Sequence, residues 1–179
     1  MKTLRHTNLL AGLLVLAVTF VLSAVLLQAQ ENTPSPEDRE ATERAAVLQI
    51  IDDAFIPGDF ATLDHYLAED YVVHSPFGDL DREATKGFLG AVRSALSDFE
   101  AIREPVVVEG QLVATRTVLS GNFSSEFASP WGVIEPNDQP ITFAFINIFR
   151  FDDQGMIAEE WVQFDNYGLL SQMGALPSA

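Results

Sequence analysis

The chain contains no cysteine among its 179 residues. Disulfides, thiol nucleophiles and cysteine-bound zinc or iron–sulfur clusters are therefore excluded. Histidine is also scarce, with only His6, His65 and His74. No His-x-His or His-Glu-x-x-His spacing occurs among them, so we predict no metal site. The sequence also lacks a glycine-rich phosphate loop and a Gly-x-Ser-x-Gly elbow, which argues against nucleotide binding and serine-hydrolase chemistry.

Basic side chains are few, with 10 Lys and Arg against 26 Asp and Glu, for a formal charge of −16. A surface of this sign repels phosphates, so a nucleic-acid partner is not expected. Hydrophobic residues make up 47% of the chain, which is enough for an ordinary core. The length suits one domain preceded by a targeting segment.

The targeting segment is predicted over residues 1–29. Basic residues precede an apolar run over residues 9–27, which is longer than the ~7–15 residues of a signal-peptide core and close to the ~20 of a spanning helix. Cleavage after Ala29 would place Leu27 at the −3 position, where a small residue is preferred. Both a cleaved signal peptide and a retained membrane anchor therefore stay open.

Either alternative predicts export. Basic residues before the apolar run and acids after it favour an internal N-terminus and an external domain. We expect a linker over residues 30–35 and a domain over residues 36–179. The domain would be secreted or anchored at the outer face of the cytoplasmic membrane.

Helical spacing predicts three helices at the start of the domain, over residues 36–55, 60–67 and 81–96. Ser35 is the expected N-cap of the first helix, with Pro36 at its first position. Strands are predicted over residues 71–74, 99–108, 111–123, 141–151 and 156–167, with a long loop over residues 124–140.

Helices followed by an antiparallel meander indicate an α+β domain, with the helices on one face of a curved, mostly antiparallel sheet. The strand over residues 141–151 is apolar on both faces, however. Four phenylalanines point one way, while Ala144, Ile146 and Ile148 point the other. Helices on one side cannot cover both faces, so we expect a homodimer built sheet to sheet.

Asp165 is the first candidate for chemistry, because it ends the predicted strand over residues 156–167. Strand alternation places it on the same face as Trp161 and Gln163. If that face is concave, an apolar environment would raise the pKa of the Asp165 carboxyl and suit it to acid/base catalysis. The alternative is an acid that caps a turn near Tyr167 and Gly168.

His74 lies where a strand meets Ser75-Pro76. It is either a substrate-binding or carboxylate-paired imidazole, or a partly exposed structural residue. Arg116 lies in mid-strand and either enters a pocket or pairs with an acid on the outer face. Glu159 and Glu160 point to opposite faces, so only one of them can reach a pocket.

Several aromatic side chains are predicted to form the core or a cavity wall rather than a cofactor platform. They are Phe143, Phe145, Phe149 and Trp161.

Several motifs together resemble a known family. Tyr71-Val72-Val73-His74-Ser75-Pro76 is one, and the most specific is Glu-Trp-x-x-x-Asp-x-x-Gly-Leu-Leu-x-Gln-x-Gly over residues 160–174. From residue 71 to residue 174 the chain resembles the SnoaL-like polyketide cyclases, often labelled ester cyclases, of the NTF2-like superfamily. Where this family often carries a histidine, the chain has Phe123, which predicts a more apolar wall.

The resemblance implies a cone-shaped α+β barrel with a closed apolar pocket, usually dimeric and without a cofactor. It also implies that Asp165 is the acid/base that removes a proton next to a carbonyl group, so that the carbanion closes a ring by aldol addition. His74 and Trp161 would position the substrate.

The leading hypothesis is an exported domain that binds a small apolar carbonyl compound and catalyses cyclase- or isomerase-like proton transfer. A non-catalytic ligand-binding or dimerisation module is the alternative, and a hydrolase or dehydratase is a third. The predicted catalytic residues are Asp165 and His74. The predicted substrate-binding residues are Trp161, Gln163, Phe143, Phe145, Arg116 and Phe123.

Overall fold

A computed structural model describes residues 34–129 and 132–176. The chain divides into two compact units, Met1–Asp38 and Arg39–Ala179. In the first unit the described residues are those around the start of helix α2 (Pro36–Ile50), where the backbone N–H of Asp38 donates to the Ser35 hydroxyl over 3.1 Å. Ser35 is thus the N-cap, as predicted.

The predicted targeting segment over residues 1–29 lies outside the described residues. Within residues 34–129 and 132–176, no helix combines the length and the apolar character needed to cross a membrane.

The three predicted helices are confirmed. Helix α2 continues into the π-helical turn η1 (Ile51–Phe55), and the second helix is the short 3₁₀ helix η2 (Phe60–His65). Helix α3 (Arg82–Ala95) begins at Asp81, whose side chain accepts a 2.8 Å hydrogen bond from the backbone N–H of Ala84.

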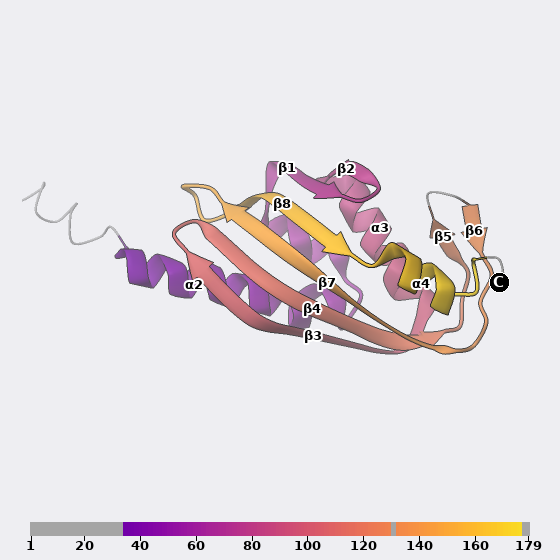
Figure 1. Cartoon of the computed structure of the whole chain (residues 1–179). Coiled ribbons are helices and arrows are strands. Elements are labelled where there is room, and N and C mark those ends of the chain that lie inside the picture. Colours follow the sequence, from indigo (N-terminus) through magenta and orange to yellow (C-terminus); the bar gives the residue numbers. More distant parts are fainter. Residues whose placement is uncertain (1–33, 130–131, 177–179) are drawn as a thin grey trace, which may run out of the picture. The chain divides into compact units, whose positions relative to one another are not determined.

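The helices form one layer of the domain, and a six-stranded sheet forms the other (Figure 1). Its strand order is β2-β1-β8-β7-β4-β3, and all neighbours are antiparallel except β1 and β8. The strands are β1 (Leu67–Ser75), β2 (Gly78–Asp81), β3 (Leu96–Glu109), β4 (Leu112–Phe123), β7 (Pro140–Phe151) and β8 (Ile157–Phe164).

Two elements differ from the sequence prediction. The loop expected over residues 124–140 contains the hairpin of β5 (Phe127–Ser129) and β6 (Gly132–Ile134). The strand expected over residues 156–167 ends at Phe164, and helix α4 (Asn166–Gln172) follows it.

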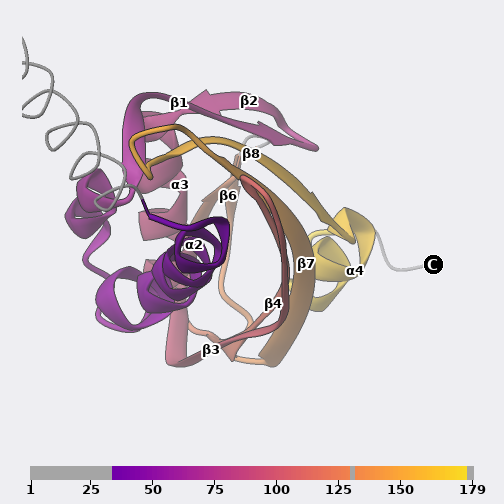
Figure 2. The same ribbon diagram turned by 90° about the vertical axis from the view of Figure 1, so that its left-hand side faces the viewer.

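The sheet curves around α2 and α3 (Figure 2). Its inner face carries much of the hydrophobic core, including Val113, Leu119 and Phe149. On its outer face Ile146 and Ile148 remain 57% and 39% exposed. The predicted alternation of β7 is therefore confirmed: helices cover one apolar face and leave the other open.

Strand β8 contains a bulge that the sequence prediction missed. Phe151 of β7 pairs with Ile157, but the preceding residue Arg150 pairs with Glu159, so Ala158 is an extra residue. A bulge of this kind reverses the alternation of the side chains that follow. Glu160 consequently points inward.

Candidate functional site

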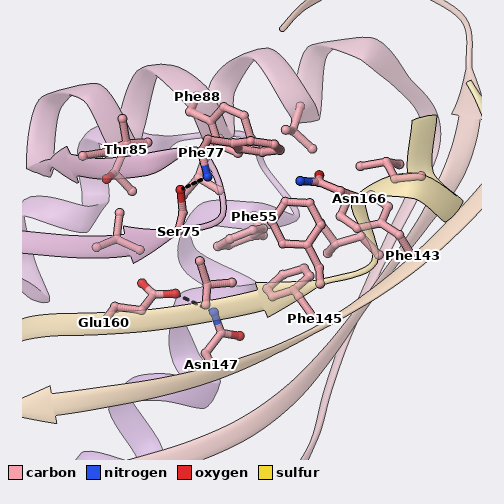
Figure 3. A pocket seen from close by; sticks show the side chains of 18 of the residues that line it. Phe55, Ser75, Phe77, Thr85, Phe88, Phe143, Phe145, Asn147, Glu160 and Asn166 are labelled. Carbon is pink, nitrogen blue, oxygen red and sulfur yellow. Dashed lines mark hydrogen bonds between the residues drawn. The ribbon is translucent and has the colours of Figure 1, made fainter. Parts of the chain in front are cut away.

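The inner face of the sheet, helix α3 and helix α4 enclose a cavity of about 140 Å³ (Figure 3). An engineered apolar cavity of ~150 Å³ admits benzene, so a ligand of about one or two rings fits this volume. The wall is overwhelmingly apolar and rich in phenylalanine. It includes Phe55, Phe77, Phe88, Phe143, Phe145 and Phe164.

The Glu160 carboxyl group forms a polar end to this cavity. It accepts a 2.5 Å hydrogen bond from the Tyr71 hydroxyl at one oxygen and a 2.5 Å bond from Asn147 Nδ2 at the other. The three residues come from β1, β7 and β8, and all three line the cavity. Neighbouring strands of the sheet thus bring together groups that are far apart in the sequence.

Arg103 extends the polar network from β3. Its Nε donates to the Thr117 hydroxyl over 2.9 Å, and that hydroxyl donates to Asn147 Oδ1 over 3.3 Å. Its Nη1 donates to the carbonyl oxygen of Val47 over 2.7 Å. Since Arg103 is only 7% exposed, this end of the cavity holds a buried cation connected to the amide that binds Glu160.

Burial dominates the protonation of these groups. It raises the pKa of Glu160 above its usual value of 4.5, an effect that the hydrogen bond from Tyr71, the nearby Arg103 charge and the bond from Asn147 partly offset. Burial together with the Glu160 charge raises the pKa of Tyr71. Burial lowers the pKa of Arg103 to about 10, so its guanidinium stays charged at neutral pH.

Glu160 retains capacity for a ligand. A carboxylate has about four lone-pair sites, and the bonds from Tyr71 and Asn147 use two of them. A carboxyl group whose pKa is raised by an apolar environment binds a proton more readily than a free glutamate does, as a general base requires. The arrangement therefore suits proton transfer to or from a bound molecule.

Among the predicted site residues, Phe143 and Phe145 line the cavity. Asp165 does not. Its side chain is exposed and accepts a 2.9 Å hydrogen bond from the backbone N–H of Gly168, which caps helix α4. Of the two roles that the sequence left open for Asp165, the structure thus shows the capping role.

Trp161 and Gln163 are exposed on the outer face, as a consequence of the bulge in β8. Arg116 is exposed on the same face, where it pairs in register with Ile146. The expectation that these side chains line the pocket is therefore wrong for the described cavity. Phe123 is fully buried, but in a second core cluster rather than in the cavity wall.

His74 also lies away from the cavity. Its Nδ1 and Nε2 lie 2.9 Å from carboxylate oxygens of Asp79 and Glu159, respectively. Its ring stacks on Trp161 with 5.6 Å between the centroids. Hydrogen bonds to Glu159 and then Asp79 raise the pKa of His74. The carboxylate pairing considered for His74 is present, and it occurs on the outer side of the sheet.

Sequence reasoning missed Tyr71, Arg103 and Asn147 as site residues. It did establish that only one of Glu159 and Glu160 can face a pocket. The available signal was that Glu160 shares strand parity with the apolar Val162 and Phe164, which line the cavity.

The terminal sequence pattern has a structural explanation. Leu169, Leu170 and Met173 of the α4 region line the cavity. Gln172 fixes the helix to β7, since its Oε1 accepts a 2.9 Å bond from the backbone N–H of Thr142. The pattern thus encodes a capped helix that closes part of the cavity wall.

The described residues contain no group of three or more histidine, aspartate or glutamate side chains that could hold a metal ion.

Comparison with known families and structures gives a consistent assignment. The profile of the SnoaL-like polyketide cyclases matches residues 45–173. No curated protein matches the chain significantly.

Solved structures with this fold come from several bacteria. A proposed SnoaL-like polyketide cyclase from Jannaschia sp. CCS1 is 19% identical, with a TM-score of 0.68 over 82% of this chain and 99% of that one. IdmH from Streptomyces antibioticus, a proposed polyketide cyclase, is 30% identical, with a TM-score of 0.58 over 79% of this chain and 99% of its own. An LEH-like epoxide hydrolase from M. tuberculosis is 20% identical, with a TM-score of 0.54 over 75% of this chain and 90% of that one. The first and third likenesses concern the fold alone.

Proposed function

The chain belongs to the SnoaL-like polyketide cyclase family, and we propose that its cavity binds a small apolar carbonyl compound on which Glu160 performs cofactor-independent proton transfer. The observation that carries this proposal is the Glu160 carboxyl group at the end of an apolar cavity, held by Tyr71 and Asn147. Asp165, the residue implied by the family resemblance, caps α4 instead.

The proposed reaction begins with a C–H bond next to the carbonyl group of the ligand. The Glu160 carboxylate takes the proton, and the electron pair of the C–H bond forms an enolate. In a cyclase-like reaction the enolate carbon attacks a second carbonyl of the same molecule, and the resulting alkoxide takes a proton back from Glu160. In an isomerase-like reaction the proton returns to another carbon. The buried Arg103 cation favours the negative charge that develops.

The test measures exchange of the α-protons of 2-tetralone and acetophenone in D₂O by NMR, with and without the protein. We expect protein-dependent exchange that Glu160→Gln reduces by at least ~100-fold, the usual range for loss of a general base. Asp165→Asn is the matched acid-to-amide control and should retain exchange, because asparagine also caps helices well.

Three outcomes would count against the assignment to Glu160. Loss of exchange in Asp165→Asn but not in Glu160→Gln would return the acid/base role to Asp165. Exchange at the wild-type rate in both variants would exclude both acids as the base. Binding of these ketones without any exchange would favour the non-catalytic ligand-binding module.

We further propose that the domain is exported, on the strength of the apolar run over residues 9–27 and its flanking charges. The expected result is that protease added to intact cells degrades the domain, or that it is found in the medium. Mass spectrometry of the N-terminus would distinguish cleavage after residue 29 from a retained anchor. Protection of the full-length protein inside intact cells would contradict export.

A further inference from the structure

Asn166 brings a polar side chain to a part of the cavity wall outside the hydrogen-bond network of Glu160. It is the first residue of α4 and belongs to the cavity wall. In Figure 3 its amide projects into the aromatic interior from the side of the cavity opposite to Glu160. Its neighbour Asp165 caps the helix and is exposed, so the turn between β8 and α4 separates an outward acid from an inward amide.

The Asn166 amide oxygen has an unmet hydrogen-bonding requirement. Its Oδ1 is buried and has no hydrogen-bond partner within the described part of the chain. Buried polar atoms are nearly always paired, so an exception at a cavity wall indicates a group that a ligand or water satisfies. Asn147 provides the comparison within the same cavity, because its amide bonds both Thr117 and Glu160.

The two polar groups are well separated. Glu160 lies in mid-β8, and Asn166 lies two residues beyond the end of this strand at Phe164. A strand rises ~3.3 Å per residue, so the Cα atoms of Glu160 and Phe164 are roughly 13 Å apart. Apolar side chains such as Phe145 and Val162 line the space between the two groups.

We propose that the cavity selects a slender, largely apolar molecule with oxygen functions at two ends, a carbonyl group whose neighbouring C–H bond faces Glu160 and a hydroxyl or second carbonyl group facing Asn166. A hydroxyl group would donate to the orphaned Oδ1, while the Asn166 amide N–H can donate to either kind of oxygen. Asn166 is then a specificity-determining residue, and the inference rests on the proposed binding of a carbonyl compound in this cavity.

The experiment compares matched ligand pairs that differ by one distal hydroxyl group. The pairs are acetophenone with 4-hydroxyacetophenone, and 2-acetonaphthone with 6-hydroxy-2-acetonaphthone, each titrated calorimetrically into the wild-type protein. We expect the hydroxylated member of at least one pair to bind about fivefold to tenfold more tightly, as one additional buried hydrogen bond provides. Asn166→Leu should abolish that preference without weakening the unsubstituted ketone.

Asn122→Leu is the matched control, because Asn122 lies in β4 and outside the cavity wall. It should retain the preference for the hydroxylated ligand, and so should Glu160→Gln if it still folds. An equal preference in wild type and Asn166→Leu would overturn the role of Asn166, and so would binding of none of the four compounds.

The same data separate this inference from the proposed reaction. Loss of α-proton exchange in Glu160→Gln together with an unchanged hydroxyl preference in Asn166→Leu would support proton transfer and reject the second anchor. A preference that depends on Asn166, without any proton exchange, would support the anchor and reject the reaction.

Discussion

At the scale of single residues, the protonation of Glu160 is set by two opposing effects. Removal from water favours the neutral acid, while Tyr71, Asn147 and the Arg103 charge favour the carboxylate. Burial has the larger effect, so folding raises the pKa of this group. The same shift that suits Glu160 to proton transfer therefore carries a cost in stability.

The raised pKa of Glu160 in the folded protein predicts that the stability difference between the wild type and Glu160→Gln depends on pH. Because the folded pKa is above the unfolded value of 4.5, the folded state holds the proton more tightly. Stability from this group is greatest below pH 4.5 and falls as pH rises through the folded pKa.

Urea denaturation from pH 4 to 8 would measure this difference. The wild type should lose stability relative to Glu160→Gln with a slope of at most about 1.4 kcal/mol per pH unit. Because both proteins share all other titrating groups, their difference isolates Glu160. A difference that stays constant, or that rises with pH, would contradict the direction of the shift.

His74 predicts a second pH effect, on the outer side of the sheet. Its bonds to Glu159 and Asp79 raise its pKa above 6.5, so its protonated form is stabilised in the folded protein. That contribution is fully present below pH 6.5 and is lost as pH rises through the folded pKa.

The check is the melting temperature at pH 6 and pH 9. The wild type should lose more thermal stability between these values than His74→Gln does. His65→Gln, which changes an exposed histidine of η2, should behave like the wild type. The prediction is refuted if His74→Gln keeps the full pH dependence.

At the scale of elements, periodicity predicted the helices and long strands but not the bulge in β8. Apolar spacing is a local signal, and it located α3 and β4 to within a few residues. A bulge depends on pairing with a partner strand: Ala158 is extra only because Arg150 and Phe151 pair with Glu159 and Ile157. That single residue moved Asp165 out of the expected pocket face and Glu160 into it.

Helix α4 carries a prediction about the Asp-x-x-Gly part of the terminal pattern. The Asp165 side chain caps this helix at the N–H of Gly168, and a Cβ atom at Gly168 would overlap the Asp165 carboxylate. Asp165→Ala should therefore cost about 1 kcal/mol, whereas Asp165→Asn should cost little. Gly168→Ala should destabilise the protein by displacing the cap.

Chemical denaturation would measure these costs, and hydrogen exchange of the α4 amides would show whether they are local. Since Leu169 and Leu170 line the cavity, Asp165→Ala should also weaken ketone binding in parallel with its loss of protection. Unchanged stability in Asp165→Ala would show that the capping bond contributes little.

At the scale of the whole molecule, the outer face of the sheet is considered as a protein interface, separately from the cavity on the inner face. The motif resemblance correctly indicated the family, and helices on one side of an antiparallel sheet follow from the order of the elements. The alternation of side chains along the sequence also showed that β7 is apolar on both faces. It could not determine that Arg116 and Trp161 share the outer face, because that depends on register across three strands.

The outer face continues to favour the proposed homodimer. Val107, Ala114, Ile148 and Trp161 pair in register, so they form a row across four strands. Three of these side chains are substantially exposed large hydrophobic groups, and Ile146 beside them is 57% exposed. Contiguous apolar surface of this kind marks a protein interface, and a twofold axis can place two such faces together.

Ile146→Glu tests this dimer, because it places a charge in the centre of the outer face without disturbing the core. The wild type should sediment as a dimer at tens of micromolar and Ile146→Glu as a monomer, since association would bury a carboxylate from each subunit. Val133→Glu is the control, because Val133 is 60% exposed but lies on β6, which is not part of the six-stranded sheet. It should remain dimeric. A monomeric wild type, or a dimer unaffected by Ile146→Glu, would remove the outer face as the interface. Ketone binding in the cavity would be unaffected in either case, because the cavity lies on the opposite face of the sheet.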